Sequence, residues 1–146
     1  MRILLFFLGL MLSSCQYSSS RDKKEVLEEK AYRLAVEGRH SVSASIYNEL
    51  IKMDSSNGAY YFGRADSYLM LLKLNESTKD YLKAIELNYL KGSCYFNLGL
   101  INCYTDDSTA LDYFKKAIEI EPKMDKYRLE YEECLERLKV SKKITP

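Results

Sequence analysis

Apolar and small side chains recur along this chain with a period of 34 residues. Within one period the apolar positions follow helical spacing, as Ile46, Leu50 and Ile51 do. A period of this length is typical of a solenoid of stacked helix pairs rather than a catalytic globule, so we predict an all-α fold. Three registers carry matching side chains: Leu27, Tyr61 and Tyr95, then Ala31, Ala65 and Gly99, then Tyr47 and Tyr81.

Small residues alternate with aromatic ones, and this alternation predicts close helix packing. The second helix of the third repeat shows it most clearly, with Ala110, Phe114 and Ala117 preceding Pro122. Helices approach closely only where Ala or Gly on one helix faces a bulky ring on the other. Each repeat should therefore be a closely packed helix pair.

The repeats occupy most of the chain. They span residues 24–57, 58–91 and 92–124, and a seventh helix at 125–140 completes a repeat domain of residues 24–140. A solenoid must end in a helix with a polar outer face, because its last repeat would otherwise expose a core face. We expect residues 141–146 to form a disordered tail.

The turns inside the repeats differ from one repeat to the next. Gly38 suits a left-handed turn in repeat one. Leu72 stands at the corresponding place in repeat two, which predicts a looser or displaced turn, with Asn75 capping a helix near 77–87. The third repeat fits the pattern only if one residue is missing around residues 105–107.

The first residues form a separate segment. Met1 and Arg2 precede a run, residues 3–12, that is apolar apart from Gly9. This run is too short to cross a bilayer, which needs about 20 apolar residues. We therefore interpret residues 1–14 as a signal peptide and the serine-rich residues 15–23 as a tether.

The end of that segment, Leu12-Ser13-Ser14-Cys15, resembles the bacterial lipobox. The resemblance implies that Cys15 is acylated, becomes the mature N-terminus and anchors the protein to a membrane. A plain secretory signal with an incidental cysteine is the alternative. Gln16 is not the aspartate that resembles an inner-membrane retention signal, which favours the outer membrane facing the periplasm.

Charge and motif content argue against several functions. The chain has 22 basic and 21 acidic residues, and such a balance lacks the basic face that nucleic-acid binding requires. The sequence contains no Gly-x-Ser-x-Gly elbow, no His-Glu-x-x-His motif and no cysteine pair at metal-binding spacing. We expect a non-enzyme with no metal, no cofactor, no small-molecule substrate and no nucleic-acid partner.

The remaining cysteines and the single histidine have two readings each. Cys94, Cys103 and Cys134 are either buried small apolar side chains or, in an oxidising periplasm, include one disulfide made by Cys134. Cys94 and Cys103 should not bridge, because they lie out of phase on one helix. His40 is expected to pack in a turn, since acid–base catalysis would need a second polar group beside it.

The repeat pattern resembles the tetratricopeptide repeat. Two segments carry the resemblance: Tyr61-x2-Arg64-Ala65-x2-Tyr68 followed by Tyr81-x2-Ala84, and Tyr95-x2-Leu98-Gly99 followed by Ala110-x3-Phe114-x2-Ala117-x4-Pro122. The resemblance implies a right-handed α-solenoid of three helix-turn-helix units with a capping helix. Such solenoids serve as scaffolds that bind other proteins.

The resemblance also implies a concave groove lined by the first helix of each repeat. This groove is apolar and aromatic with acidic flanks, and it suits an amphipathic helix or strand that carries basic residues. The alternative is that Phe62, Phe96 and Tyr104 pack against a neighbouring helix or the helix carrying Cys134. The residues expected to line the groove are Glu28, Tyr32, Val36, Phe62, Asp66, Leu69, Met70, Phe96, Leu100, Cys103 and Tyr104.

Family members that grip the C-terminal carboxylate of chaperones use basic and amide side chains on this face. The corresponding positions here hold Glu28, Tyr32 and Ser93, and only Asn97 matches. We therefore expect no carboxylate clamp.

The leading functional hypothesis is a membrane-anchored adaptor of the bacterial cell envelope. Its groove would hold a peptide or helix of a protein partner from an envelope assembly. Two alternatives remain, an accessory subunit of an envelope enzyme and a structural homo-oligomer stacked end to end, and the charged last helix argues against the oligomer.

Overall fold

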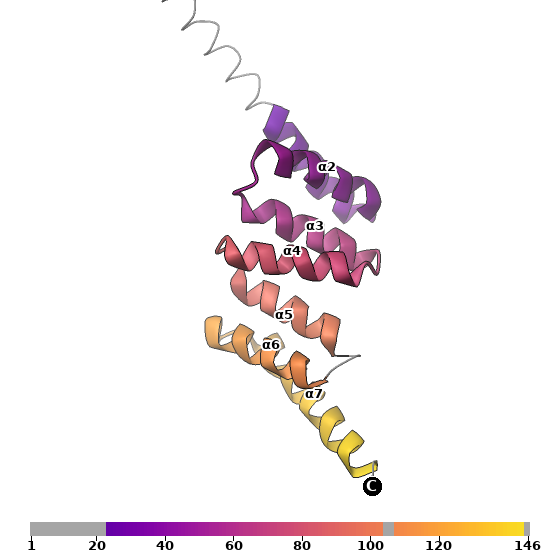
Figure 1. The fold of residues 1–146 in the computed structure, drawn as a ribbon, viewed down its shortest axis with the longest axis vertical. Helices are drawn as coiled ribbons and strands as arrows, with labels where there is room; N and C mark the ends of the chain where they lie inside the picture. The colour runs from indigo at the N-terminus through magenta and orange to yellow at the C-terminus, as the bar shows by residue number, and fades with distance from the viewer. Residues whose placement is uncertain (1–22, 104–106, 145–146) are drawn as a thin grey trace, which may run out of the picture.

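The computed structural model describes residues 23–103 and 107–144, and all regular structure in these ranges is helical (Figure 1). A helix over residues 23–36 is followed by six more, which stack in sequence order along the long axis. The predicted all-α solenoid of helix pairs with a capping helix is confirmed. The six are α2 (His40–Met53), α3 (Gly58–Met70), α4 (Leu74–Glu86), α5 (Lys91–Asn102), α6 (Asp107–Ile120) and α7 (Asp125–Ile144).

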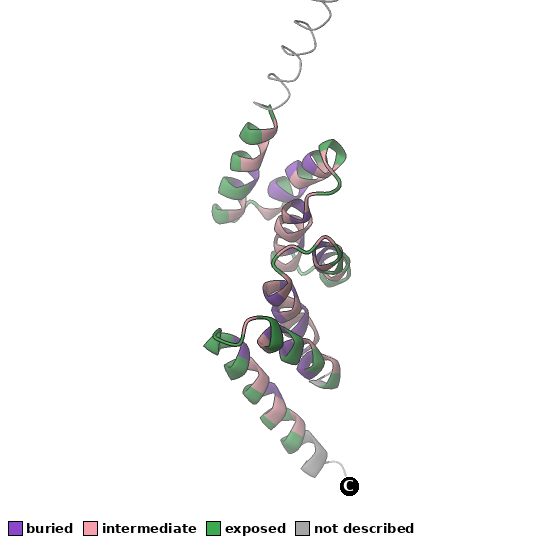
Figure 2. Ribbon diagram, turned by 90° about the vertical axis from the view of Figure 1, so that its left-hand side faces the viewer, coloured by how far each residue is buried: buried purple, intermediate pink, exposed green. Residues whose placement is uncertain are grey.

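Each helix packs mainly against the helices before and after it in the chain. Buried residues lie on the faces where helices meet, and exposed residues lie on the outer faces (Figure 2). Because contacts are local, the core consists of a row of clusters rather than one centre. Among the helices in the described ranges, none combines the length and apolar character needed to cross a bilayer.

Small residues set the distance between the helices of a pair. A Cβ added to Gly99 would lie 2.5 Å from a ring carbon of Phe114, so only glycine permits this approach. Ala65 and Tyr81 occupy the equivalent places in repeat two and are both fully buried in one cluster. Phe114 follows Tyr81 by 33 rather than 34 residues, which agrees with the predicted deletion in the third repeat. Of the residues 105–107 around which the deletion was placed, 105 and 106 lie outside the described residues, and Asp107 begins α6.

A buried hydrogen bond repeats with the period of the sequence. The Ser43 hydroxyl donates to the backbone oxygen of Ala31 at 2.9 Å, and the Ser77 hydroxyl donates to that of Ala65 at the same distance. Both serines are fully buried, so each bond satisfies a polar group that would otherwise cost about 1–3 kcal/mol. Within each of repeats one and two, this bond joins the second helix to the first.

Arg64 of α3 connects three helices. Its Nε and Nη2 donate to the two carboxylate oxygens of Asp80 on α4, at 2.6 and 2.7 Å. Its Nη1 donates to Asn48 on α2 at 2.5 Å. Asp80 is buried, so removing either charged partner would leave an uncompensated charge in the interior.

The turn of repeat two is neither looser nor displaced, contrary to the sequence-based expectation. Leu72 adopts φ +58°, the left-handed region that Gly38 occupies with φ +76° in repeat one. The amides after α3 bond as they do in repeat one: Leu72 and Lys73 donate to Leu69 and Tyr68, as Gly38 and Arg39 donate to Ala35 and Leu34. Leu72 therefore adopts the left-handed backbone conformation that usually requires glycine.

Other predicted boundaries also need correction. Asn75 is not a cap, because α4 begins at Leu74 and the preceding Lys73 makes no side-chain capping bond. The helix α7 continues to Ile144, so residues 141–144 are helical rather than part of a disordered tail. The described cysteines Cys94, Cys103 and Cys134 are buried, as the apolar reading expects. The predicted signal peptide and the tether up to residue 22 lie outside the described residues.

The strained turn leads to a stability prediction. Leu72 is 82% exposed, so its side chain contributes little packing, whereas a left-handed conformation costs a non-glycine residue about 1–2 kcal/mol. We expect Leu72→Gly to be more stable than Leu72→Ala by about 1 kcal/mol, measured by urea denaturation. Both variants lose the exposed side chain and only Leu72→Gly loses the strain, so equal stabilities would contradict this account.

Candidate protein-binding groove

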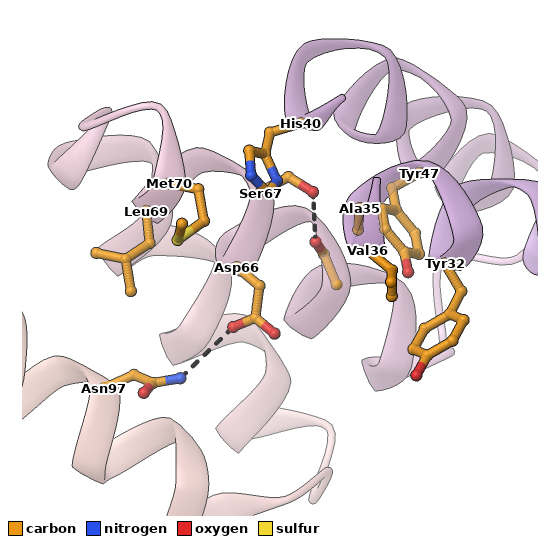
Figure 3. A pocket seen from close by; sticks show the side chains of 11 residues that line it. Tyr32, Ala35, Val36, His40, Tyr47, Asp66, Ser67, Leu69, Met70 and Asn97 are labelled. Atoms are coloured by element: carbon orange, nitrogen blue, oxygen red, sulfur yellow. Dashed lines mark hydrogen bonds between the residues drawn. The ribbon is translucent and has the colours of Figure 1, made fainter. Parts of the chain in front are cut away.

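Two adjoining hollows, each of about 470 Å³, lie between the 23–36 helix, α2 and α3. They share Tyr32, Tyr47, Gly63 and Asp66, so they adjoin, and together they are called the groove below. The first hollow, drawn in Figure 3, is also lined by Ala35, Val36, His40, Ser67, Leu69, Met70 and Asn97. The second is also lined by Glu28, Asn57, Ala59, Tyr60, Phe62 and Tyr89.

The rim of the groove is apolar and open to solvent. Tyr32, Val36 and Met70 are 68%, 70% and 64% exposed, although all three are large hydrophobic side chains. Tyr32 and Val36 come from the 23–36 helix and Met70 from the end of α3, so the groove brings two repeats together. Apolar side chains that gather around a hollow on a soluble face indicate a binding surface.

Gly63 allows Tyr47 to enter the groove. A Cβ at Gly63 would collide with the end of the Tyr47 ring, so the tyrosine occupies space that only glycine leaves open. Tyr47 is half-buried there, and burial, assisted by the nearby Asp66 charge, raises the pKa of its hydroxyl. Tyr47 therefore stays neutral and presents a ring and a hydroxyl to the groove.

Asp66 places a carboxylate in the groove. Its Oδ1 accepts hydrogen bonds from the Tyr81 hydroxyl at 2.5 Å and from Asn97 Nδ2 at 3.5 Å, and Asn97 also donates to Tyr81 at 2.9 Å. Figure 3 shows the bond to Asn97 and the second carboxylate oxygen turned away from it. Burial raises the pKa of the Asp66 carboxyl, and the hydrogen bond from Tyr81 opposes part of that rise.

The second acid of the groove, Glu28, is better compensated. It accepts a hydrogen bond from the Tyr60 hydroxyl. Lys24 lies over the Tyr60 ring, 5.5 Å from its centroid, and also donates to Asp54 at 3.1 Å. A basic side chain therefore lies near Glu28, whereas the residues that line the groove around Asp66 include no Lys or Arg.

No protein-family model matches the chain, but solved structures of tetratricopeptide-repeat domains superpose on most of it. The Sgt2 domain from Aspergillus fumigatus shares 16% identity, with 85% of this chain and 84% of that chain covered and a TM-score of 0.75. The described chain has the tetratricopeptide-repeat fold.

Two further tetratricopeptide-fold structures are as similar and contain peptides. The first such domain of Spaghetti (RPAP3), bound to the HSP90 peptide SRMEEVD, shares 22% identity over 80% of this chain and 94% of that chain, with a TM-score of 0.73. The Yersinia enterocolitica type III secretion chaperone SycD, in complex with a peptide of the translocator YopD, shares 14% identity over 83% and 95%, with a TM-score of 0.73.

The structure brings most of the predicted groove residues together. Tyr32, Val36, Asp66, Leu69 and Met70 line the first hollow, so repeats one and two supply its walls as the tetratricopeptide register implies. Glu28 and Phe62 line the second hollow. Phe62 also packs edge-on against Tyr81 and Tyr89, with ring centroids 5.7 and 5.8 Å apart, so only part of its ring faces the opening.

Of the third repeat only Asn97 lines the groove, which corrects the predicted lining. Phe96 and Cys103 are only 8% and 6% exposed. The Phe96 ring stacks on Tyr127 of α7 with centroids 4.7 Å apart, and Leu100 packs against the same cluster. The capping helix therefore covers this face, and the packing alternative holds for Phe96. Tyr104 lies outside the described residues.

Several lining residues were not predicted, chiefly Tyr47, Tyr60, Gly63 and Tyr89. Tyr47 shares the register of the fully buried Tyr81, so the repeat pattern alone does not show that it lines a hollow. That hollow depends on Gly63, which has no counterpart in the other repeats. His40 lines the first hollow, and its Nδ1 is buried without a hydrogen-bond partner among the described residues. Among the described residues, His40 Nδ1 therefore lacks the neighbouring polar group that acid–base catalysis would need.

The Asp66 environment predicts a pH-dependent cost in stability. Because the folded-state pKa of Asp66 is raised, the folded protein holds this proton more tightly than the unfolded chain does. The stabilising effect of the protonated form is complete below the ordinary value of 3.8 and is lost as the pH rises through the folded-state pKa. We expect Asp66→Asn to be more stable than wild type at neutral pH, with the difference shrinking toward zero in acid.

Urea denaturation followed by circular dichroism at a series of pH values measures this difference. Asn retains a carbonyl that accepts the bonds from Tyr81 and Asn97, so the variant changes mainly the charge. Glu29→Gln removes an exposed carboxylate from the 23–36 helix and serves as the matched control. A stability difference between Asp66→Asn and wild type that stays constant with pH would refute the raised folded-state pKa of Asp66.

Proposed function

We propose that this protein is a membrane-anchored adaptor of the bacterial cell envelope, which binds a peptide or helix of a partner protein in the groove of repeats one and two. The observation that carries the proposal is the open apolar groove around Tyr32, Val36 and Met70. Exposed rings and a methionine can repack around varied side chains, which suits a protein ligand.

Solved structures of the same fold support a peptide as the ligand. The first tetratricopeptide domain of Spaghetti is bound to an HSP90 peptide, the TPR2B domain of yeast Sti1 forms a complex with pHsp70, and SycD holds a peptide of YopD. Three of the last four residues of the HSP90 peptide SRMEEVD are acidic. Since the present groove carries Glu28 and Asp66 and no basic lining residue, its ligand should differ in charge from that peptide.

The anchoring part of the proposal rests on the sequence alone. The apolar residues 3–12 and the following Leu12-Ser13-Ser14-Cys15 support a lipidated N-terminus at Cys15. Each buried acyl methylene contributes about 0.8 kcal/mol, and stable anchoring takes more than one chain. The outer membrane, with the domain facing the periplasm, is the location that Gln16 favours.

The groove is tested by affinity capture from detergent-solubilised envelopes with the tagged full chain. We expect wild type to recover a partner that a Val36→Glu, Met70→Glu double variant loses by about 10-fold or more, because two charges replace apolar contacts of about 1.5 kcal/mol or more each. Mass spectrometry of the captured proteins provides the measurement.

The matched control is Leu82→Glu, which puts a charge on an exposed leucine of α4, away from the groove lining. All variants must keep the helical circular dichroism of wild type. Equal recovery by wild type and the double variant would place partner binding elsewhere on the molecule. Capture of only the chain itself would instead favour the homo-oligomer.

The anchor is tested by metabolic labelling with an alkyne-tagged fatty acid. We expect the label on the wild-type protein and its complete loss in Cys15→Ser, because Cys15 is the only cysteine that lies directly after the apolar segment, at the end of Leu12-Ser13-Ser14-Cys15. Cys94→Ser, which changes a buried cysteine of α5, should retain the label. Absence of label from wild type would leave the plain secretory signal as the explanation of residues 1–14.

A further inference from the structure

We propose that the groove selects partner segments that place a lysine or arginine against Asp66, between apolar side chains that contact Val36 and Met70. The proposal deepens the adaptor function above and rests on it. It assigns the specificity of the groove to one carboxylate, and it identifies the occupant as a basic, amphipathic segment of another protein.

The Asp66 carboxylate is held in place by other residues. Tyr81 comes from α4 and Asn97 from α5, and both donate to the same oxygen, Oδ1. Tyr81 is fully buried and cannot move without disturbing the core around Ala65. The second oxygen, Oδ2, accepts no hydrogen bond from the described residues. A fixed carboxylate with one uncommitted oxygen is arranged to accept a bond from a ligand.

No described residue of the groove neutralises this carboxylate. The lining of both hollows contains no Lys or Arg. The nearby Arg64, on the same helix as Asp66, is committed to Asp80 and Asn48, and Lys24 is committed to Asp54. A partly buried carboxylate without a cation is costly to the free protein, and a cation from a partner relieves that cost.

The rest of the lining suits the stem of a long basic side chain. Lys and Arg pack their methylene groups along apolar surface while the charged end reaches a polar group. Tyr32 and Tyr47 flank Asp66 in both hollows and provide ring faces for such a stem or for the cation itself. Val36 and Met70 lie on the exposed rim, where apolar neighbours of the basic residue would contact them.

Charge complementarity favours a basic segment over an apolar or an acidic one as the ligand of the groove. A purely apolar segment would bury Asp66 further without compensating its charge, and an acidic one would repel both Asp66 and Glu28. A lysine or arginine donates to the free oxygen and forms a charge-assisted hydrogen bond. The groove therefore discriminates by charge as well as by shape.

The test is a selection from a random peptide library displayed on phage, with the full-length chain immobilised in detergent. We expect enriched sequences to share one Lys or Arg with apolar residues on either side. Selection on Asp66→Asn, which keeps the hydrogen bonds to Tyr81 and Asn97, should lose the basic position. Enrichment of the same basic position on Asp66→Asn would overturn the assignment to Asp66.

Binding of an enriched peptide is then measured by fluorescence anisotropy. Replacing its basic residue by norleucine should weaken binding by roughly 10- to 100-fold, which corresponds to one hydrogen bond to a charged group of about 1.5–3 kcal/mol. Against Asp66→Asn the two peptides should bind with similar affinity. A loss on norleucine replacement that is the same for wild type and Asp66→Asn would contradict the proposal.

The outcomes distinguish a failure of the role of Asp66 from a failure of the groove as a binding site. Enriched peptides that lack a basic residue but lose binding to Val36→Glu, Met70→Glu would keep the groove function and overturn the role of Asp66. Peptides that bind the double variant as well as wild type would overturn both. Circular dichroism of every variant checks that a loss of binding is not a loss of folding.

Discussion

The ring of Phe114 lies so close to Gly99 that a single added carbon at Gly99 would collide with it, and this close approach of paired helices governs the rest of the structure. Ala65 plays the same part beside Tyr81, and Ala31 lies in the cluster against which Tyr47 packs. Once the helices of a pair are this close, the buried Ser43 and Ser77 hydroxyls can reach backbone oxygens on the partner helix. The apolar periodicity is thus converted into a fixed geometry of stacked pairs.

The capping helix decides how much of the concave face is available. By stacking its Tyr127 on Phe96 and burying its own Cys134, α7 packs against the third repeat in a separate cluster. The groove is thereby confined to repeats one and two and reaches α5 only at Asn97. A solenoid with few repeats has to cover its last apolar face, and here the covering helix occupies the part of the concave face where Phe96 was expected to line the groove.

Stability and recognition oppose each other at Asp66. The hydrogen bonds from Tyr81 and Asn97 hold its carboxylate in a groove with no lining cation, and burial raises its pKa, so the charge is unfavourable for the folded protein alone. Arg64 and Asp80, by contrast, pair fully and join helices. Of these two charged sites, the first therefore lacks a cation within the groove lining, and our proposal assigns that cation to a ligand, whereas the second is complete within the fold.

The amino-acid sequence by itself determined the period, the helix pairs and the close contacts at Ala65 and Gly99, because helical spacing and side-chain size are local properties. The groove residues expected in the first two repeats came from the resemblance to the tetratricopeptide repeat. Only the tertiary structure decided that Leu72 takes a left-handed turn, since the packing of α3 and α4 outweighs the conformational preference of one residue. It also decided that Phe96 is covered whereas Tyr47 is only half-buried. Whether a ring on a helix is buried depends on α7 and on the space left by Gly63, which are contacts between residues distant in the chain.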